Sequence, residues 1–224
     1  MFPPIRDGFE AMVGDFGLEF RSLADIGCGT GIFLRYVLRY PLKLFGVDAA
    51  RPMLRIAARR LAGAPVCLLC QDMRGLRLPR PVGLITCHGD TLNYLIHPHD
   101  LMRTLSRFRC NLRLGGHVIF DVLTGTPPPA PGPSAVGNAN GGIIRWRCRV
   151  DPRRGFTRVE VNSLTSTGGG QWQREVHLQR WFRPREIQTC LRRCGLKLRA
   201  MRRLDQAATT GSSGAWLQLL AQAR

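Results

Sequence analysis

The segment that most constrains the fold is a glycine-rich stretch at residues 23–31, which reads LADIGCGTG. Residues 23–26 predict a strand, and Gly27, Gly29 and Gly31 predict a tight turn that leads into a helix over residues 33–40. Glycine permits the turn and lets a ligand approach the backbone without meeting a Cβ atom. Because the N–H groups at the start of a helix attract electron-rich groups, the segment predicts a strand–turn–helix unit that binds a ligand.

Beyond this turn, short apolar runs alternate with amphipathic stretches as far as residue 124. Further elements are predicted as strands at residues 44–47, 66–69, 82–87 and 117–122 and as helices at residues 53–61 and 101–112. Such alternation is typical of a parallel sheet with crossover helices. Residues 1–123 are therefore expected to form a doubly wound α/β core that begins with one short helix near residues 7–16.

The composition changes at residue 124. Residues 124–142 are rich in proline, glycine and alanine and predict a long loop that forms neither a helix nor a central strand. Three strand-like segments within residues 143–182 are separated by turn signals, which predicts a small antiparallel β-meander with one polar, arginine-lined face. Residues 183–224 predict a helix that begins at Pro184, followed by two strands that close the main sheet.

Two predicted strands end near a carboxylate. Asp25 lies at the end of the first strand, where it can face a cationic group, and Asp48 ends the second, where it can accept hydrogen bonds from two ribose hydroxyls. The turn reads GxGxG, because Ile32 occupies the place of the third glycine in a dinucleotide fingerprint. The missing glycine and the carboxylate before the turn both disfavour NAD.

The size and composition exclude several classes of protein. A chain of 224 residues suits one domain with a small insertion. No apolar run approaches the roughly 18 residues of a membrane span, and the first ten residues, MFPPIRDGFE, lack the apolar block of a secretory signal. We therefore expect a cytoplasmic protein with no membrane partner, whose eight cysteines are reduced thiols.

Two cysteine pairs raise the question of a metal site. Cys67 and Cys70 lie in VCLLC, which predicts a buried strand on which residues three apart point to opposite faces. Cys190 and Cys194 are four apart on a predicted helix and could share a ligand, but no second pair has the spacing of a zinc site. The prediction is that the protein holds no metal.

The charge is the unusual part of the composition. The chain has 33 basic and 15 acidic side chains and a formal net charge of +18, and only Lys43 and Lys197 are lysines. Of these, 17 basic and 5 acidic residues follow residue 141. Such a field attracts nucleic acid, anionic membranes or acidic small molecules. However, the arginines are scattered rather than clustered, and a GC-rich genome produces the same bias.

Five blocks within residues 23–124 occur in the order and spacing of a known family. LADIGCGTGIFL matches its first motif, GVDAARPML its second, and CQDMRGL its adenine-binding turn. LITCHGDTLNYL and LRLGGHVIFDVLT match the fourth and fifth strands. In these blocks the sequence resembles the class I S-adenosylmethionine-dependent methyltransferases of the small-molecule type. The resemblance implies a mostly parallel, seven-stranded Rossmann-like sheet, the cofactor S-adenosylmethionine and the product S-adenosylhomocysteine.

Taken residue by residue, the resemblance assigns the cofactor contacts to Asp25, Gly27, Cys28, Gly29, Gly31, Asp48, Asp72, Met73 and His88. The glycine turn would pass beneath the methionine part, and Asp25 would orient its amino group. Asp48 would hold the ribose. Asp72 would accept from the adenine amino group, with the backbone N–H of Met73 at a ring nitrogen. His88 would line the methionine end near the sulfonium.

Methyl transfer is an in-line displacement at an activated carbon, so much of the catalysis comes from proximity and alignment. A base is needed only if the acceptor must lose a proton. The candidates are His88 and His97, and then His99, His177 and Asp90. Tyr94 and Trp181 are candidates for packing against the acceptor. Only 22 residues precede the first strand, so residues 143–182 are expected to cover the substrate instead of an N-terminal lid.

Three functions are open at this point. The leading hypothesis is methyl transfer to N or O of a small-molecule acceptor. A second is RNA methylation, which the basic C-terminal third favours. Against it, base-amino methyltransferases share an Asn/Asp-Pro-Pro-Tyr/Phe block after the fourth strand, and this chain has HGDT there, at residues 88–91. A third is a methyltransferase-like scaffold that binds the cofactor without turnover. The sequence predicts no oligomeric state.

Overall fold

A computed structural model describes residues 3–126, 134–137, 143–164, 172–204 and 214–224. In the first part of the chain the elements are α1 Pro3–Asp15, β1 Ser22–Ile26, α2 Ile32–Val37, β2 Lys43–Asp48, α3 Arg51–Arg60, β3 Val66–Cys70, η1 Met73–Gly75, β4 Val82–Cys87, η2 Thr91–Tyr94, α4 Asp100–Asn111 and β5 Leu112–Thr124. They are followed by β6 Ser134–Gly137, β7 Ile143–Asp151, β8 Phe156–Leu164, β9 Trp172–Arg180, α5 Pro184–Arg193, β10 Leu196–Arg203 and β11 Ala215–Ala223.

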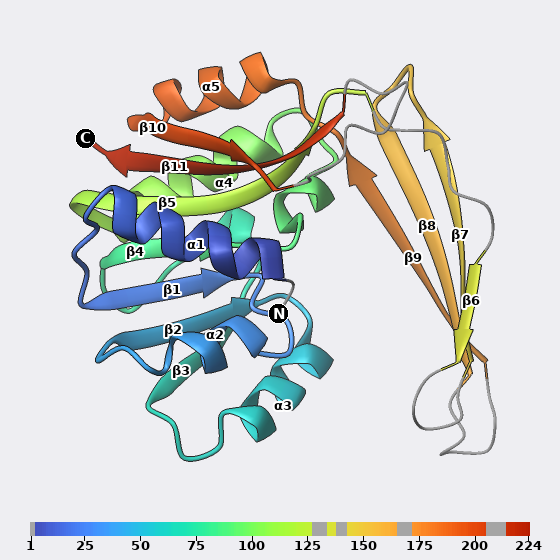
Figure 1. Cartoon of the computed structure of the whole chain (residues 1–224), viewed down its shortest axis with the longest axis horizontal. Helices are drawn as coiled ribbons and strands as arrows, with labels where there is room; N and C mark the ends of the chain where they lie inside the picture. The colour runs from blue at the N-terminus through green and yellow to red at the C-terminus, as the bar shows by residue number, and fades with distance from the viewer. Residues whose placement is uncertain (1–2, 127–133, 138–142, 165–171, 205–213) are drawn as a thin grey trace.

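The main sheet has seven strands in the order β10-β11-β5-β4-β1-β2-β3 (Figure 1). β1 pairs in parallel with both β2 and β4, and the chain order reverses at this strand. β11 runs antiparallel between β5 and β10, and it closes the sheet as the sequence predicts. The doubly wound, mostly parallel Rossmann-like sheet is thus confirmed.

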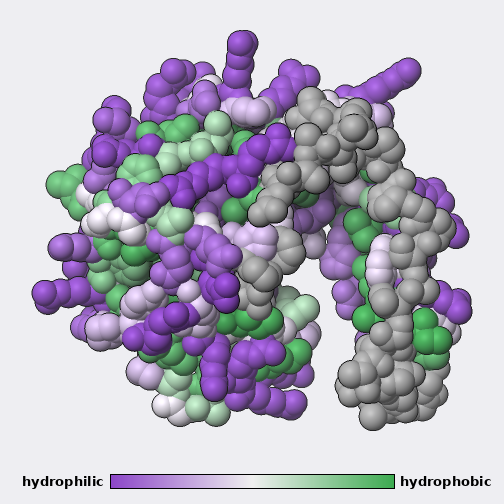
Figure 2. Space-filling view, in the orientation of Figure 1, coloured by the Kyte–Doolittle hydropathy of each residue, from purple (hydrophilic) through white to green (hydrophobic). Residues whose placement is uncertain are grey.

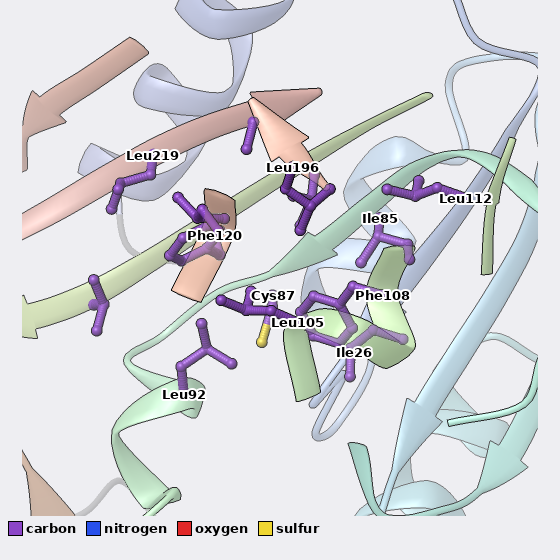
Figure 3. Packing of buried hydrophobic residues seen from close by; sticks show 14 of the residues in the cluster. Ile26, Ile85, Cys87, Leu92, Leu105, Phe108, Leu112, Phe120, Leu196 and Leu219 are labelled. Carbon is purple, nitrogen blue, oxygen red and sulfur yellow. The ribbon is translucent and has the colours of Figure 1, made fainter. Parts of the chain in front are cut away.

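Helices cover both faces of this sheet. On one face Leu105 and Phe108 of α4 pack against apolar side chains of β4, β5 and β11 (Figure 3). Ile187 of α5 belongs to the same cluster. On the other face α1, α2 and α3 pack through a second apolar cluster that contains Phe9 and Leu34. Burial on both faces explains why the central strands are almost continuously apolar. Among the helices in the described ranges, none is long and apolar enough to cross a membrane.

The second sheet is the predicted antiparallel meander, with four strands in the order β6-β7-β8-β9. Figure 1 shows it standing beside the carboxyl-end side of the main sheet, and Figure 2 shows the molecule hollowed between the two. Along β7, Arg145, Arg147 and Arg149 are exposed, whereas Trp146 and Cys148 between them are partly buried. The sheet therefore has one arginine-lined face, as its alternating sequence predicts.

The structure corrects three expectations. Residues 134–137 lie in the predicted loop but form β6, an edge strand, where a proline-rich neighbourhood is tolerated. β5 begins at Leu112 rather than at residue 117, because the segment before the glycines continues as extended chain and α4 ends at Asn111. The predicted buried strand at residues 66–69 is β3, which lies at the sheet edge, so Cys67 and Cys70 are exposed.

Candidate functional site

A cavity of about 590 Å³ opens at the carboxyl ends of β1, β2 and β3. Its described lining consists of Ile26, Gly27, Gly29, Asp48, Ala49, Ala50, Met53, Gln71, Asp72, Met73, Arg74, Thr91, Tyr94, Leu95, Ile96, His97 and His177. Ligands of open α/β sheets bind where the strand order reverses, outside the carboxyl ends of the strands. The cavity has this position, beside β1.

The floor of the cavity is the turn between β1 and α2. The backbone N–H groups of Gly27 and Cys28 donate to the carbonyl of Val47 over 2.7 and 3.0 Å, which holds the turn against β2. Gly27 has a φ of +70° and Gly29 a φ of +53°, which glycine adopts at no steric cost. A Cβ atom at Gly27 would lie 2.4 Å from the Thr91 methyl carbon, whereas one at Gly29 would meet nothing within 4 Å.

Asp48 stands at the end of β2 and lines the cavity. Its carboxylate accepts from the backbone N–H groups of Gly29 and Ala50, over 2.8 and 2.7 Å. Two carboxylate oxygens offer about four acceptor positions, so two remain after these bonds. Asp48 therefore both fixes the glycine turn and keeps capacity for a pair of ligand hydroxyls.

The far end of the cavity is formed by η1. Asp72 accepts from the backbone N–H of Arg74 over 2.8 Å, and the Arg74 guanidinium lies 2.6 Å from the same carboxylate. These bonds to Arg74 lower the pKa of Asp72. The Arg74 guanidinium also pairs with Asp100 of α4 over 3.1 Å. Asp72 and Met73 thus both line the cavity, and the adenine contacts that the resemblance implies for them remain predictions.

The residues present fit an adenosine-containing ligand. Apolar side chains, among them Ile26, Met53 and Leu95, line the cavity and can enclose an aromatic base. Asp48 can accept from ribose hydroxyls, and the open space above Gly29 lets a ligand lie directly on the backbone. His97 also lines this cavity, whereas His99 is the N-cap residue of α4 and does not belong to the described lining.

Asp25 is placed differently from the cavity residues. It is 3% exposed, accepts from the Thr86 hydroxyl over 2.9 Å and is absent from the described lining. Burial raises the pKa of Asp25 to about 6, and Asp48 and Asp121 add to the rise, whereas His88 and Thr86 oppose it. Cys28 and Gly31 also lie outside the described lining, with Cys28 packed in the core beneath α2.

The raised pKa of Asp25 predicts a pH-dependent loss of stability. The folded protein holds the Asp25 proton up to about pH 6 and the unfolded chain only up to about pH 4, so stability falls as the pH rises between these values. Asp25→Asn removes this loss. Relative to the parent, its free energy of unfolding should be raised by about 2–3 kcal/mol at pH 7.5 and by much less at pH 4. Urea unfolding at both pH values measures the difference; an equal effect of Asp7→Asn, at an exposed carboxylate, would contradict it.

His88 follows β4 but lies outside the described lining of the cavity. Its side chain is 7% exposed and is packed against the rings of Phe33 and Phe9, whose centroids are 4.7 and 6.3 Å from its own. Nδ1 of His88 lies 3.2 Å from a carboxylate oxygen of Asp121. The backbone carbonyl of His88 accepts from the hydroxyl of Thr91, which does line the cavity.

Asp90 begins the next turn with a φ of +50°, which is unusual for a residue other than glycine. Burial raises the pKa of Asp90 to about 6. The side-chain amide of Gln179, on β9, donates to its carboxylate. A strained backbone and a partly buried carboxylate with a raised pKa at the same residue are features that cluster at functional sites.

Three contacts join η2 and Asp90, the residue before it, to β9 of the meander. In addition to the Gln179 bond, the Tyr94 hydroxyl lies 2.9 Å from Nδ1 of His177, and the Asn93 side-chain amide donates to the Arg180 carbonyl. His177 therefore reaches the cavity from the second sheet. Trp181 instead donates to the Thr157 hydroxyl over 3.0 Å at the base of the meander.

Sequence reasoning missed three polar residues of this region. Asp121 interrupts an apolar strand, and that charge inside the run VIFDVL was the signal that could have found it. Thr91 and Gln179 gave no such signal, because their positions depend on the turn after β4 and on how the meander docks against the core.

Comparisons with known proteins agree with the fold and with the cofactor. A family model described as a methyltransferase domain matches residues 23–116. An N,N-dimethyltransferase of dTDP-3-amino-3,6-dideoxy-α-D-glucopyranose from Streptomyces fradiae is 30% identical over 158 residues, which are 70% of this chain and 61% of the relative. The chain belongs to the class I S-adenosylmethionine-dependent methyltransferases. Their cofactor, S-adenosylmethionine, is the ligand that the cavity fits.

Two further comparisons concern a second relative and a solved structure of the same fold. An N,N-dimethyltransferase of dTDP-4-amino-2,3,4,6-tetradeoxy-D-glucose from Saccharopolyspora spinosa is 31% identical over 103 residues, which are 46% of this chain and 41% of the relative. The chain thus spans about two fifths to three fifths of these relatives. The fold matches the crystal structure of a methyltransferase from Clostridium acetobutylicum with a TM-score of 0.82, at 20% identity, over 100% of this chain and 92% of that one. Within the described residues, no group of His, Cys, Asp and Glu side chains is arranged to hold a metal ion.

Proposed function

We propose that this methyltransferase transfers the methyl group of S-adenosylmethionine to an amine nitrogen of a small molecule. The observation that carries the proposal is the cavity over the glycine turn, with Asp48 at its wall and with His177 reaching it from the second sheet. The cavity offers a place for the cofactor, and the hollow between the sheets offers a place for an acceptor beside it (Figure 2).

The local charge supports a cationic acceptor. The chain has more than twice as many basic as acidic side chains, yet Asp48 and Asp72 line the cavity and Arg74 is the one arginine in its described lining. Arg74 is itself paired with Asp72 and Asp100. The charged residues that line the cavity are thus mainly acidic, whereas the molecule as a whole has a positive net charge. Such a site favours the positive sulfonium of the cofactor and an amine, which can bind as its ammonium ion and reacts after that ion has lost a proton, over an acidic metabolite.

The meander supplies the opposite wall. Paired residues of an antiparallel sheet share a face, and the register pairs Val159 with both Cys148 and His177, and Val161 with both Trp146 and Glu175. The face that carries His177 is therefore apolar at its centre, and Glu175 adds a carboxylate 3.4 Å from the His177 ring. This arrangement suits an acceptor with an apolar body and an amine. The two relatives named above act on amino sugars.

The cofactor supplies a methyl group on positively charged sulfur, which an amine attacks in line. The protein's own contribution is to hold the acceptor nitrogen against that carbon and to take up the proton that the nitrogen releases. In this proposal Asp90 and Glu175 attract the ammonium, and Tyr94 and His177, which both line the cavity, close the site from two elements.

RNA methylation is less well supported. The exposed arginines of β7 share their face with Arg158 and Leu178, the face opposite to the one that carries His177. A nucleic acid held by these arginines would lie across the sheet from the cavity. Cytoplasmic location and the division at residues 123, 142 and 182 remain predictions.

The test is a methylation assay with S-adenosylmethionine and matched pairs of acceptors, each pair an amine and its hydroxyl analogue. Mass spectrometry should find the methylated amines and little of the methylated alcohols. Asp90→Asn should raise the KM for the amine more than that for the cofactor. Equal methylation of both members of each pair would overturn the assignment of an amine acceptor. Methylation of neither would overturn the proposal that the protein is a methyltransferase of such small molecules.

A further inference from the structure

A second cavity, of about 380 Å³, opens on the face of the meander that carries its exposed arginines. Its described lining shares no residue with that of the cofactor cavity. Leu178 of β9 lines the second cavity, whereas His177, the residue before it, lines the first. Because successive residues of a strand point to opposite faces, the two cavities lie on opposite sides of the meander.

Two arginines of the second cavity stand side by side. The register places Arg149 of β7 directly opposite Arg158 of β8, and both line the cavity. The Cβ atoms of such a pair are about 4.5–5.5 Å apart, and like charges in this position destabilise a sheet. Arginine does not lose its proton in proteins, so both side chains are charged. An oxyanion between the two guanidinium groups would offset the repulsion and accept charge-assisted hydrogen bonds from both.

The acidic side chains nearby leave Arg149 without a partner. Arg158 pairs with Glu160 over 3.1 Å. Arg154, a third arginine of the lining, lies 3.8 Å from Asp151, whose carboxylate also accepts from the Arg154 backbone N–H. Within the part of the chain that the structure describes, Arg149 has neither an ion pair nor a side-chain hydrogen bond. The cavity therefore has an excess of positive charge centred on Arg149 and Arg158.

The rest of the cavity offers an apolar surface beside these arginines. Leu178 pairs with Arg158 in the register and is 38% exposed. Phe156 lies two positions before Arg158 on the same face of β8, and it is partly buried. Both side chains can pack against a ring or an aliphatic group. The volume lies within the range of small-molecule sites, which is roughly 300–1,000 Å³.

We infer that this cavity binds a small molecule in which an oxyanion, a phosphate or a carboxylate, is attached to an apolar body. The oxyanion lies between the guanidinium groups of Arg149 and Arg158, and the apolar body packs against Phe156 and Leu178. Because the meander separates this cavity from the cofactor, the ligand is not the methyl acceptor. Its binding does not depend on the proposed function.

Calorimetric titration of the full chain with four probes tests the ligand class. The probes are phenyl phosphate, benzoate, inorganic phosphate and phenol, at about 0.15 M ionic strength, where the long-range attraction of the net charge is screened. The better of the two aromatic anions should bind at least about tenfold more tightly than either inorganic phosphate or phenol, and it identifies the oxyanion. Binding of neither aromatic anion overturns the inference, and so does inorganic phosphate that binds as tightly as phenyl phosphate.

Matched variants locate the site. Arg149→Gln should weaken the binding of that anion by about 10- to 150-fold, because it removes a charged hydrogen-bond donor. Arg147→Gln removes the same charge from the next exposed position on this face of β7, outside the described lining, and should change the Kd by less than about threefold. Leu178→Ala should weaken the binding of the aromatic anion and leave that of inorganic phosphate unchanged.

Circular dichroism should show that the three variants keep their fold. Equal losses in the two arginine variants would assign the binding to the diffuse positive charge of the face, and unchanged binding in Arg149→Gln would place the ligand elsewhere. Either result overturns the inference. None of these measurements requires methyl transfer, so a protein that methylates no amine would overturn the proposed function and leave this test intact.

Discussion

Replacing Asp48 by alanine should weaken the binding of S-adenosylmethionine by about 30- to 150-fold, or about 2–3 kcal/mol, because it removes a pair of charge-assisted hydrogen bonds to the ribose. The same carboxylate accepts from the N–H of Gly29, so the variant also loses the bond that holds the turn in place. Isothermal titration calorimetry on the purified protein measures the change.

A matched control separates the contribution of the Asp48 position from that of the negative charge of the cavity as a whole. Asp72→Ala removes a carboxylate from the same cavity, but one that is already engaged by Arg74, so its effect on the Kd should be severalfold smaller. Equal losses in the two variants would mean that the cavity charge as a whole, rather than the ribose contact, is what binds the cofactor. Unchanged binding in Asp48→Ala would remove the assignment of the ribose site.

Most of the main sheet could be predicted because its signals are local. The glycine turn requires a strand before it and a helix after it, and the apolar runs of β1, β2 and β4 are buried on both faces. The errors lie where tertiary context decides. The segment at residues 134–137 became a strand because β7 offers it a free edge, and a sequence pattern alone cannot show that edge.

The cofactor side of the site was more predictable than the acceptor side. Asp48, Asp72 and Met73 follow strands whose carboxyl ends meet at one edge, so their approach to one cavity follows from the topology. Asp121 comes from a strand three positions along the sheet from β2, and His177 comes from another sheet altogether. Their roles depend on long-range contacts, such as the pair of Tyr94 with His177, for which no spacing rule exists.

Replacing Gly27 by alanine should have the other large effect, because two costs coincide at this position. A φ of +70° costs a residue with a Cβ atom roughly 1–2 kcal/mol, and the new methyl group would overlap the Thr91 side chain, an overpacking that typically costs a further 1–3 kcal/mol. The turn must shift to relieve the overlap, and the turn is the surface on which the cofactor lies. We expect a loss of about 2–5 kcal/mol, divided between the free energy of unfolding and cofactor affinity.

Gly29→Ala is the matched control for Gly27→Ala, since Gly29 also has a positive φ but its Cβ would enter open space. Gly29→Ala should lower the free energy of unfolding only by the backbone strain. It should lower cofactor affinity only if the methyl group blocks a contact in the bound state. The double variant Gly27→Ala with Thr91→Gly should recover the part of the loss that comes from overlap and leave the strain. Denaturant unfolding and calorimetry on the three variants separate the two costs. If the double variant recovers nothing, backbone strain rather than contact with Thr91 explains why glycine is needed at position 27. Packing between the cofactor turn and the segment after β4 would then not be the reason for this glycine.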